Sequence, residues 1–267
     1  MSDYFKDPRL NASTLKCFAG QDYSPAVALQ KWKGPRTQTK ALSLGSLTHA
    51  FVEGRGELPE GTILKERDEE SEGLGAEFIL SPFDDFRKKD ARDWKAGLPE
   101  GLTPIKPSEL IQARDMAHSL LNKIEAPYSG ILLDPESQRE KEYYTDRLKA
   151  KLDLVSKSGL MCLEVKTTRH STWSDIKRDF DRMAYHLQIF QYHKVSQVQT
   201  IAAVIVSSVA PYPVFQAPCS DDYLEYGEWE FNRAFERYQI WKDCHPEEVP
   251  VTEETLGAPN WWLNREK

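Results

Sequence analysis

The segment from Arg139 to Val165 constrains the fold most tightly, because it reads as three consecutive short strands. The tripeptide Lys157-Ser158-Gly159 separates the last two strands as a tight turn. A near-continuous apolar run predicts a buried strand further along, and periodic apolar positions predict helices on both sides. The expected strands are 140–146, 148–156, 160–165, 200–208 and 213–217, and the expected helices are 13–18, one starting near 24, 43–53, 106–124, 182–195 and 221–241. This order predicts an α/β fold whose central mixed sheet contains an antiparallel hairpin and is flanked by helices.

Length and composition favour one elaborated domain. The chain has 267 residues, of which 29% are charged and 40% are apolar, and these values are ordinary for a globular protein. We expect one domain over 1–267, with a helical N-terminal part at 1–135, a sheet core at 136–217 and a C-terminal helix and tail at 218–267. No apolar run is long enough to span a membrane, and charges stand where a signal peptide needs apolar residues. A cytoplasmic protein without a membrane partner is therefore expected.

Charge is distributed unevenly along the chain, although the net charge is -7. Residues 1–55 hold eight Lys and Arg against four Asp and Glu, whereas residues 217–267 hold five against twelve. The basic residues Lys31, Lys33, Arg36 and Lys40 follow one another without an intervening acid. They are candidates for binding a polyanion such as a phosphate backbone, and the alternative is an ordinary solvated surface.

The hairpin before and after Ser158-Gly159 places two carboxylates opposite each other. If these two residues form the turn, the numbers of paired residues add up to 317, and Asp153 then faces Glu164. Their Cβ atoms would lie roughly 4.5–5.5 Å apart, so the pair calls for a divalent cation between them. Lys166 follows on the same face of the strand, where its ammonium could orient water or neutralise a phosphoryl oxygen. The alternative is an ordinary polar strand face, and a slip of one residue would turn Asp153 away.

Two helices carry further candidates for this site. Gln188 and Tyr192 stand four residues apart and therefore share one face of a helix. His49 lies one helical turn after Gly45, a residue that would allow another segment to approach closely. His49 could bind a metal, or it could form a surface pair with Glu53 four residues later.

These motifs, taken in order, resemble a known nuclease superfamily. They are G-x-x-x-H at 45–49, K-x-D at 151–153, E-V-K-T-T at 164–168 and Y-H-L-Q-x-x-x-Y at 185–192. The chain is similar over about 11–241 to the RecB-like branch of the PD-(D/E)xK nucleases, and most similar to the phage and prophage RecE type, exonuclease VIII. In one departure, Glu164 stands where relatives usually have aspartate. The four cysteines form no C-x-x-C pair, so no iron–sulfur cluster is expected.

The resemblance implies a PD-(D/E)xK core and a Mg²⁺-dependent exonuclease that digests linear double-stranded DNA from 5′ to 3′ and leaves single-stranded 3′ overhangs for recombination. It implies two Mg²⁺ ions, replaceable by Mn²⁺, with His49, Asp153, Glu164 and the Val165 carbonyl as ligands. Lys166 would serve the attacking water, and Gln188 and Tyr192 would support the site. The implied partners are DNA ends, a single-strand-annealing recombinase and further copies of the chain, in a ring of four rather than three.

Two alternatives to this activity remain. One is a structure-selective or restriction-type endonuclease of the same fold, and the other is a catalytically silent DNA-binding or assembly module. Enzymes of small-molecule chemistry are disfavoured, because the sequence has no GxxxxGK[ST], GxGxxG or GxSxG motif.

Overall fold

The computed structural model describes residues 4, 6–20, 24–33, 40–56, 78–99 and 102–243. Its helices are α1 (Ala12–Lys16), α2 (Pro25–Lys33), α3 (Lys40–Glu53), α4 (Lys89–Ala96), α5 (Pro107–Lys123), α6 (Tyr128–Leu132), α7 (Trp173–Arg182), α8 (Tyr185–Ser196) and α9 (Asp221–Asp243). Its strands are β1 (Phe78–Leu80), β2 (Thr103–Ile105), β3 (Gln138–Tyr144), β4 (Lys149–Val155), β5 (Met161–Thr168), β6 (Thr200–Ser207) and β7 (Val214–Pro218). Within these ranges, no helix combines the length and the apolar character that crossing a membrane requires.

A five-stranded mixed sheet forms the centre of the molecule, in the order β3-β4-β5-β6-β7. Only β5 and β6 run parallel, and the other neighbouring pairs are antiparallel. A parallel pair needs a long crossover, which α7 and α8 provide between these two strands. The α/β class and the mixed sheet flanked by helices are therefore as predicted. The strands β1 and β2 form a separate parallel pair that the sequence did not predict.

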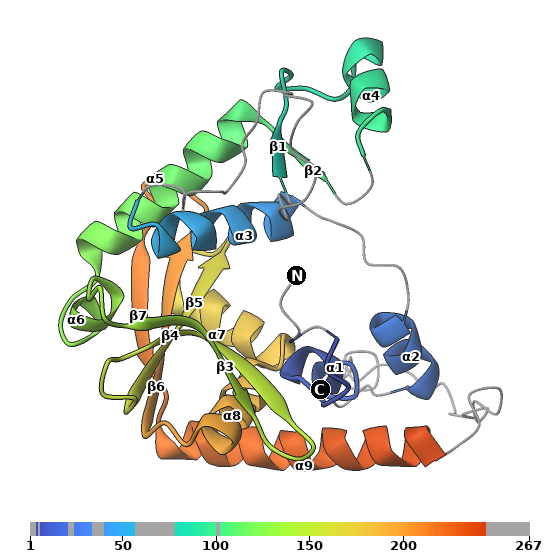
Figure 1. The fold of residues 1–267 in the computed structure, drawn as a ribbon, viewed down its shortest axis with the longest axis vertical. Helices are drawn as coiled ribbons and strands as arrows, with labels where there is room; N and C mark the ends of the chain where they lie inside the picture. The colour runs from blue at the N-terminus through green and yellow to red at the C-terminus, as the bar shows by residue number, and fades with distance from the viewer. Residues whose placement is uncertain are drawn as a thin grey trace, which may run out of the picture.

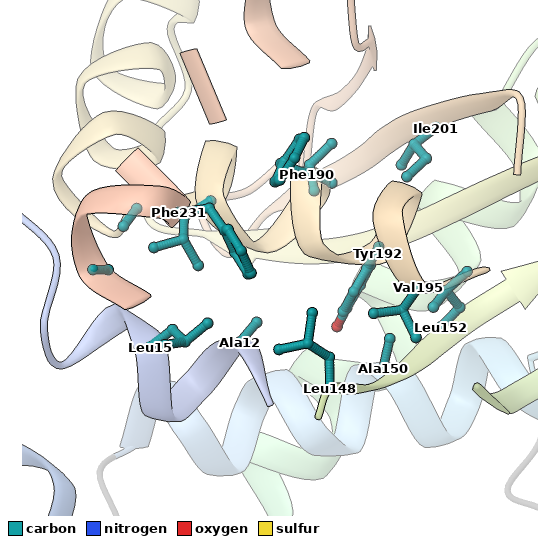
Figure 2. Packing of buried hydrophobic residues seen from close by; sticks show 14 of the residues in the cluster. Ala12, Leu15, Leu148, Ala150, Leu152, Phe190, Tyr192, Val195, Ile201 and Phe231 are labelled. Atoms are coloured by element: carbon teal, nitrogen blue, oxygen red, sulfur yellow. The ribbon is translucent and has the colours of Figure 1, made fainter. Parts of the chain in front are cut away.

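Helices cover the sheet on both sides (Figure 1). On one side, α3 and α5 pack against apolar residues of β5 and β6, among them Val165 and Val204. On the other side, α1, α8 and α9 form a second apolar cluster with β4. Figure 2 shows part of that cluster, with Leu15 from α1, Leu152 from β4 and Tyr192 from α8. The short helix α1 is therefore anchored next to the face of α8 that approaches the sheet.

The hairpin of β4 and β5 has the predicted register and a wider turn. Leu154 pairs with Leu163 and Val155 with Cys162, so paired numbers add up to 317 as predicted. The turn closes where the Gly159 N–H donates to the Ser156 carbonyl at 2.8 Å, and Gly159 adopts a φ of +75°. Glycine tolerates this left-handed conformation at little cost. Because the loop is longer by one residue on each side, its symmetry leaves the register unchanged.

The helix predicted over 182–195 is α8, and a second helix, α7, precedes it where the sequence predicted none. α7 ends at Arg182 and α8 begins at Tyr185, and Ala184 between them has a left-handed φ of +49°. The sequence did not predict α7 because its ten residues are mostly charged or polar and only Ile176 is fully buried. The stretch 54–75 is rich in Gly and charged residues, which predicts a surface excursion, and it lies outside the described residues from 57 onward.

Candidate active site

The strands β4 and β5 separate at Asp153. Their described pairs stop at Leu154 and Leu163, so the expected direct pairing of Asp153 with Glu164 is not part of the ladder. Instead, Oδ2 of Asp153 accepts a hydrogen bond from the Val165 N–H at 2.8 Å. The carboxylate occupies the place that a main-chain acceptor would otherwise take. The sheet itself therefore fixes the position of Asp153.

Glu164 is the most deeply buried acid of this region, with 2% of its surface exposed. Its Oε1 accepts hydrogen bonds from Gln188 Nε2 at 2.6 Å and from the Lys166 ammonium. Its Oε2 is buried and has no hydrogen-bond partner among the described residues. Burial, followed by the charge of Asp153, raises the pKa of Glu164 to about 7. Burial also raises the pKa of Asp153 to about 6. Both acids therefore hold their protons more tightly than acids in water.

Lys166 brings a positive charge to this pair. Its ammonium contacts Glu164 Oε1 and lies 5.1 Å from the centre of the Tyr185 ring. Burial alone would lower the pKa of Lys166, but the Glu164 and Asp153 carboxylates outweigh burial, and the pKa is raised. Lys166 is therefore an ammonium at neutral pH. It offsets part of the negative charge in the fork, which is the place where β4 and β5 part and where Asp153, Glu164 and Lys166 lie.

Gln188 and Tyr192 face this site from α8, on one side of the helix as predicted. The Gln188 Nε2 donates to the Tyr192 hydroxyl at 2.7 Å and to Glu164 Oε1. Both residues are buried, with 9% of their surfaces exposed. Burial, followed by the charge of Glu164, raises the pKa of Tyr192 well above its usual range, so its hydroxyl stays protonated.

His49 approaches the carboxylates from α3. Its Nδ1 lies 3.9 Å from Asp153 Oδ2, which is too far for a hydrogen bond. Burial and then the charge of Lys166 lower the pKa of His49, which favours the neutral imidazole that binds metals. Among the described side chains, no ion pair joins His49 to Glu53, so His49 turns to the site and not to the surface pair. A Cβ at Gly45 would lie 3.2 Å from Thr167 Oγ1, which accords with the predicted close approach, here of α3 to β5.

Lys16 and Tyr185 were not predicted as site residues. The Lys16 ammonium donates a hydrogen bond to Gln188 Oε1 and lies 4.1 Å from the centre of the Tyr185 ring. Burial and then the charge of Lys166 lower the pKa of Lys16 to about 7. No local pattern connects Lys16 with α8, because 172 positions separate it from Gln188. Only the packing of α1 against α8 reveals the contact.

The basic segment is only partly described. Lys31 and Lys33 are exposed at the end of α2, and the Lys33 ammonium lies 5.0 Å from the centre of the Trp241 ring in α9. Arg36 lies outside the described residues, as does the side chain of Lys40 at the start of α3. The role of these residues in DNA binding stays a prediction.

The residues of the fork fit a divalent cation in part. No group of three or more His, Cys, Asp or Glu side chains in the described ranges is arranged closely enough to hold a metal. However, Asp153 and Glu164 provide two carboxylates, half-buried and buried respectively, and Oε2 of Glu164 has no partner in the described part of the chain. His49 is the nearest described histidine to this pair, with its Nδ1 3.9 Å from Asp153 Oδ2. The carbonyl of Val165 is next to these groups in sequence, and its part as a ligand stays a prediction.

Comparisons with known proteins indicate the fold. No protein-family model matches the chain, and no curated protein matches it. Among solved structures, it is similar to the crystal structure of a "Putative exonuclease" from Eubacterium rectale, with a TM-score of 0.56 and 13% sequence identity. The likeness covers 100% of this chain and 96% of the other. At this identity the match shows that the two chains share a fold.

Proposed function

We propose that this protein is a metal-dependent deoxyribonuclease of the PD-(D/E)xK type that digests linear double-stranded DNA from its ends. The observation that carries the proposal is the fork in the sheet, where Asp153, Glu164 and Lys166 meet with one carboxylate oxygen left without a partner among the described residues. Two neighbouring acids with raised pKa values, one buried and one half-buried, are costly beside a lysine in a structural core, and such groups concentrate at functional sites. The shared fold with the Eubacterium rectale protein supports the same class of activity.

The proposed roles follow from these contacts. Asp153 and Glu164 would hold Mg²⁺ with His49 as a third ligand, and the resemblance to RecE-type nucleases adds the Val165 carbonyl and a second ion per site. Bound Mg²⁺ supplies Lewis-acid polarisation of the phosphate and a more acidic water. Lys166 stays protonated, so it acts by holding the attacking water and the negative charge on the phosphate, and not by removing a proton.

Gln188 and Tyr192 serve the site as supports. Gln188 donates to the Glu164 oxygen that also receives Lys166, and Tyr192 shares the same amide group. Partners of this kind typically affect metal affinity or activity by roughly 10–100-fold.

The finer parts of the proposal come from the resemblance to RecE-type nucleases. They are 5′ to 3′ polarity, 3′ overhangs for recombination, a single-strand-annealing recombinase as partner, and a ring of four subunits, with three as the alternative count. In such a ring the basic segment with Lys31 and Lys33 would face the DNA, because a chain of net charge -7 otherwise repels a polyanion.

Digestion of matched linear and circular duplexes tests this function. Each substrate is incubated with the protein and Mg²⁺, and the linear one carries a label on one 5′ or one 3′ end. We expect the linear duplex to be degraded, with early loss of the 5′ label, while the covalently closed circle stays intact. Cleavage of the circle would replace the proposal by an endonuclease, and binding without any cleavage would replace it by a DNA-binding module.

A further inference from the structure

The amide of Gln188 is held from three directions. Its Nε2 donates to Glu164 Oε1 at 2.6 Å and to the Tyr192 hydroxyl at 2.7 Å, and its Oε1 accepts from the Lys16 ammonium. While Lys16 is protonated, below its pKa of about 7, its ammonium can only donate hydrogen bonds, so the amide atom that faces it is then the oxygen. The nitrogen of Gln188 must then face Glu164 and Tyr192. Lys16 therefore determines which way the amide points.

This orientation also selects between the two oxygens of Glu164. Oε1 receives both Gln188 and Lys166, whereas Oε2 is buried without a partner among the described residues. If the amide turned over, its oxygen would face an acceptor on Glu164, and the carboxylate would lose a donor. Lys166 would then be the one described donor left on Glu164, and Oε2 would be kept free less strictly.

We propose that Lys16 is a positioning residue of the active site. Acting through Gln188, it holds Glu164 with Oε2 free, and so it connects the short N-terminal helix α1 to the site on β5. Oε2 of Glu164 is then available to bind a divalent cation, and this part of the inference rests on the proposed function. Lys16 itself touches neither carboxylate through a hydrogen bond, since its described contacts are Gln188 Oε1 and the face of the Tyr185 ring.

The packing around α1 makes this connection rigid. Ala12 and Leu15 are buried in the cluster that α1 shares with α8 and β4, so the helix cannot shift without disturbing the core. Asn11 caps the helix by accepting a hydrogen bond from the Thr14 N–H at 2.8 Å. The anchored helix fixes the point from which the Lys16 side chain extends toward Gln188, which suits a positioning role.

Four single variants of the full chain test the inference, together with a double variant that combines Lys16→Met with Gln188→Ala. Lys16→Met removes the donor but keeps most of the volume, Lys16→Arg keeps a donor, and Gln188→Ala removes the amide. Lys149→Met is the matched control. The Lys149 ammonium is also buried and ties the N-terminal segment to the sheet, but it donates to the main-chain oxygens of Tyr4 and Asp7. Loss of folding is monitored by thermal unfolding in every variant.

The first readout is the pair of side-chain NH₂ signals of Gln188 in the ¹⁵N NMR spectrum of the metal-free protein, identified by their absence in Gln188→Ala. We expect Lys16→Met to shift and broaden these signals, and Lys16→Arg and Lys149→Met to leave them close to wild type. Unchanged Gln188 signals in Lys16→Met would overturn the inference. If Lys16→Met does not fold, the result rests on Lys16→Arg, and loss of the Gln188 signals in that variant would contradict a donor role.

The second readout is binding of Mn²⁺ alone, measured by titration calorimetry. We expect Lys16→Met and Gln188→Ala each to weaken Mn²⁺ binding roughly tenfold or more, because both disturb the support of one ligand. The double variant should be no weaker than Gln188→Ala, since the two residues act in series. Additive losses would overturn the inference. If the wild type bound no Mn²⁺, the proposed function would fail, and the contact between Lys16 and Gln188 would still be decided by the NMR signals.

Discussion

Replacing Asp153 by asparagine should stabilise the metal-free protein above neutral pH while abolishing its activity. Asparagine has nearly the same shape, and its side-chain oxygen can still accept the Val165 N–H that Asp153 accepts at 2.8 Å. The substitution removes one negative charge from a buried site that also holds Glu164. The carboxylate is therefore retained at a cost to the fold, which is a mark of a functional residue.

The magnitude follows from the pKa of Asp153, which rises from 3.8 to about 6. The folded protein binds this proton more tightly than the unfolded chain, so stability falls as the pH rises from about 4 to about 6. One pKa unit corresponds to about 1.4 kcal/mol, and so the ionised carboxylate costs up to about 3 kcal/mol at pH 8. The uncharged amide of the variant carries no such cost. The difference in unfolding free energy should therefore be near zero at pH 4 and about 1–3 kcal/mol in favour of Asp153→Asn at pH 8.

Thermal unfolding at pH 4 and pH 8, with EDTA and then with Mg²⁺, measures this difference. At pH 8 without metal, Asp153→Asn should melt higher by about 2–4 °C per kcal/mol. Mg²⁺ should raise the melting temperature of the wild type and have little effect on the variant. Asp175→Asn is the control, because hydrogen bonding to Thr172 lowers the pKa of Asp175 and its substitution should have no stabilising effect at pH 8. If Asp153→Asn were destabilised equally at both pH values, the ionised Asp153 carboxylate would not be a cost to the stability of the metal-free protein.

Three further results are expected. Gly227 lies in α9, and a Cβ there would lie within 3.0 Å of α8. Gly227→Ala should therefore lower the unfolding free energy by roughly 1–3 kcal/mol in a denaturant titration. Gly130→Ala is the control and should not lower the unfolding free energy, because its Cβ would meet nothing within 4 Å. His49→Ala should reduce the rate of Mg²⁺-dependent DNA digestion by a factor of ten or more, with partial recovery in Mn²⁺, and a wild-type rate would remove His49 from the site. Substituting Lys31 and Lys33 together by alanine should weaken DNA binding and lower its salt dependence by up to about two units in a log–log plot from fluorescence anisotropy, and an unchanged slope would exclude them as phosphate contacts.

The parts of the fold that the sequence predicts best are those set by local pattern. Alternation and turn residues predicted β3, β4 and β5, and the register followed although the turn has two more residues than expected. That success had a physical reason, since an antiparallel hairpin keeps its pairing when a loop grows equally on both sides. The apolar run at β6 likewise predicted a strand that is buried from Ile201 to Ser207.

Features that depend on distant contacts were not predictable. The pattern indicated Gln188 and Tyr192 on one helix face, but nothing local indicated that Lys16 would bind the same amide. The short parallel pair of β1 and β2 has three residues in each strand, too few for a periodic signal. The expected direct pairing of Asp153 with Glu164 in the ladder was wrong. Asp153 instead accepts a hydrogen bond from the Val165 N–H where the two strands separate.

The most direct test of the central claim compares the wild type with Lys166→Met on linear duplex DNA in Mg²⁺, with released acid-soluble nucleotide as the readout. Methionine keeps most of the length and the apolar stem of the lysine but removes the ammonium that contacts Glu164. We expect that the wild type degrades the duplex, that EDTA stops it, and that Lys166→Met retains its fold but loses activity by several orders of magnitude. Equal rates for the two proteins, or digestion that persists in EDTA, would show that this site is not a metal-dependent nuclease centre.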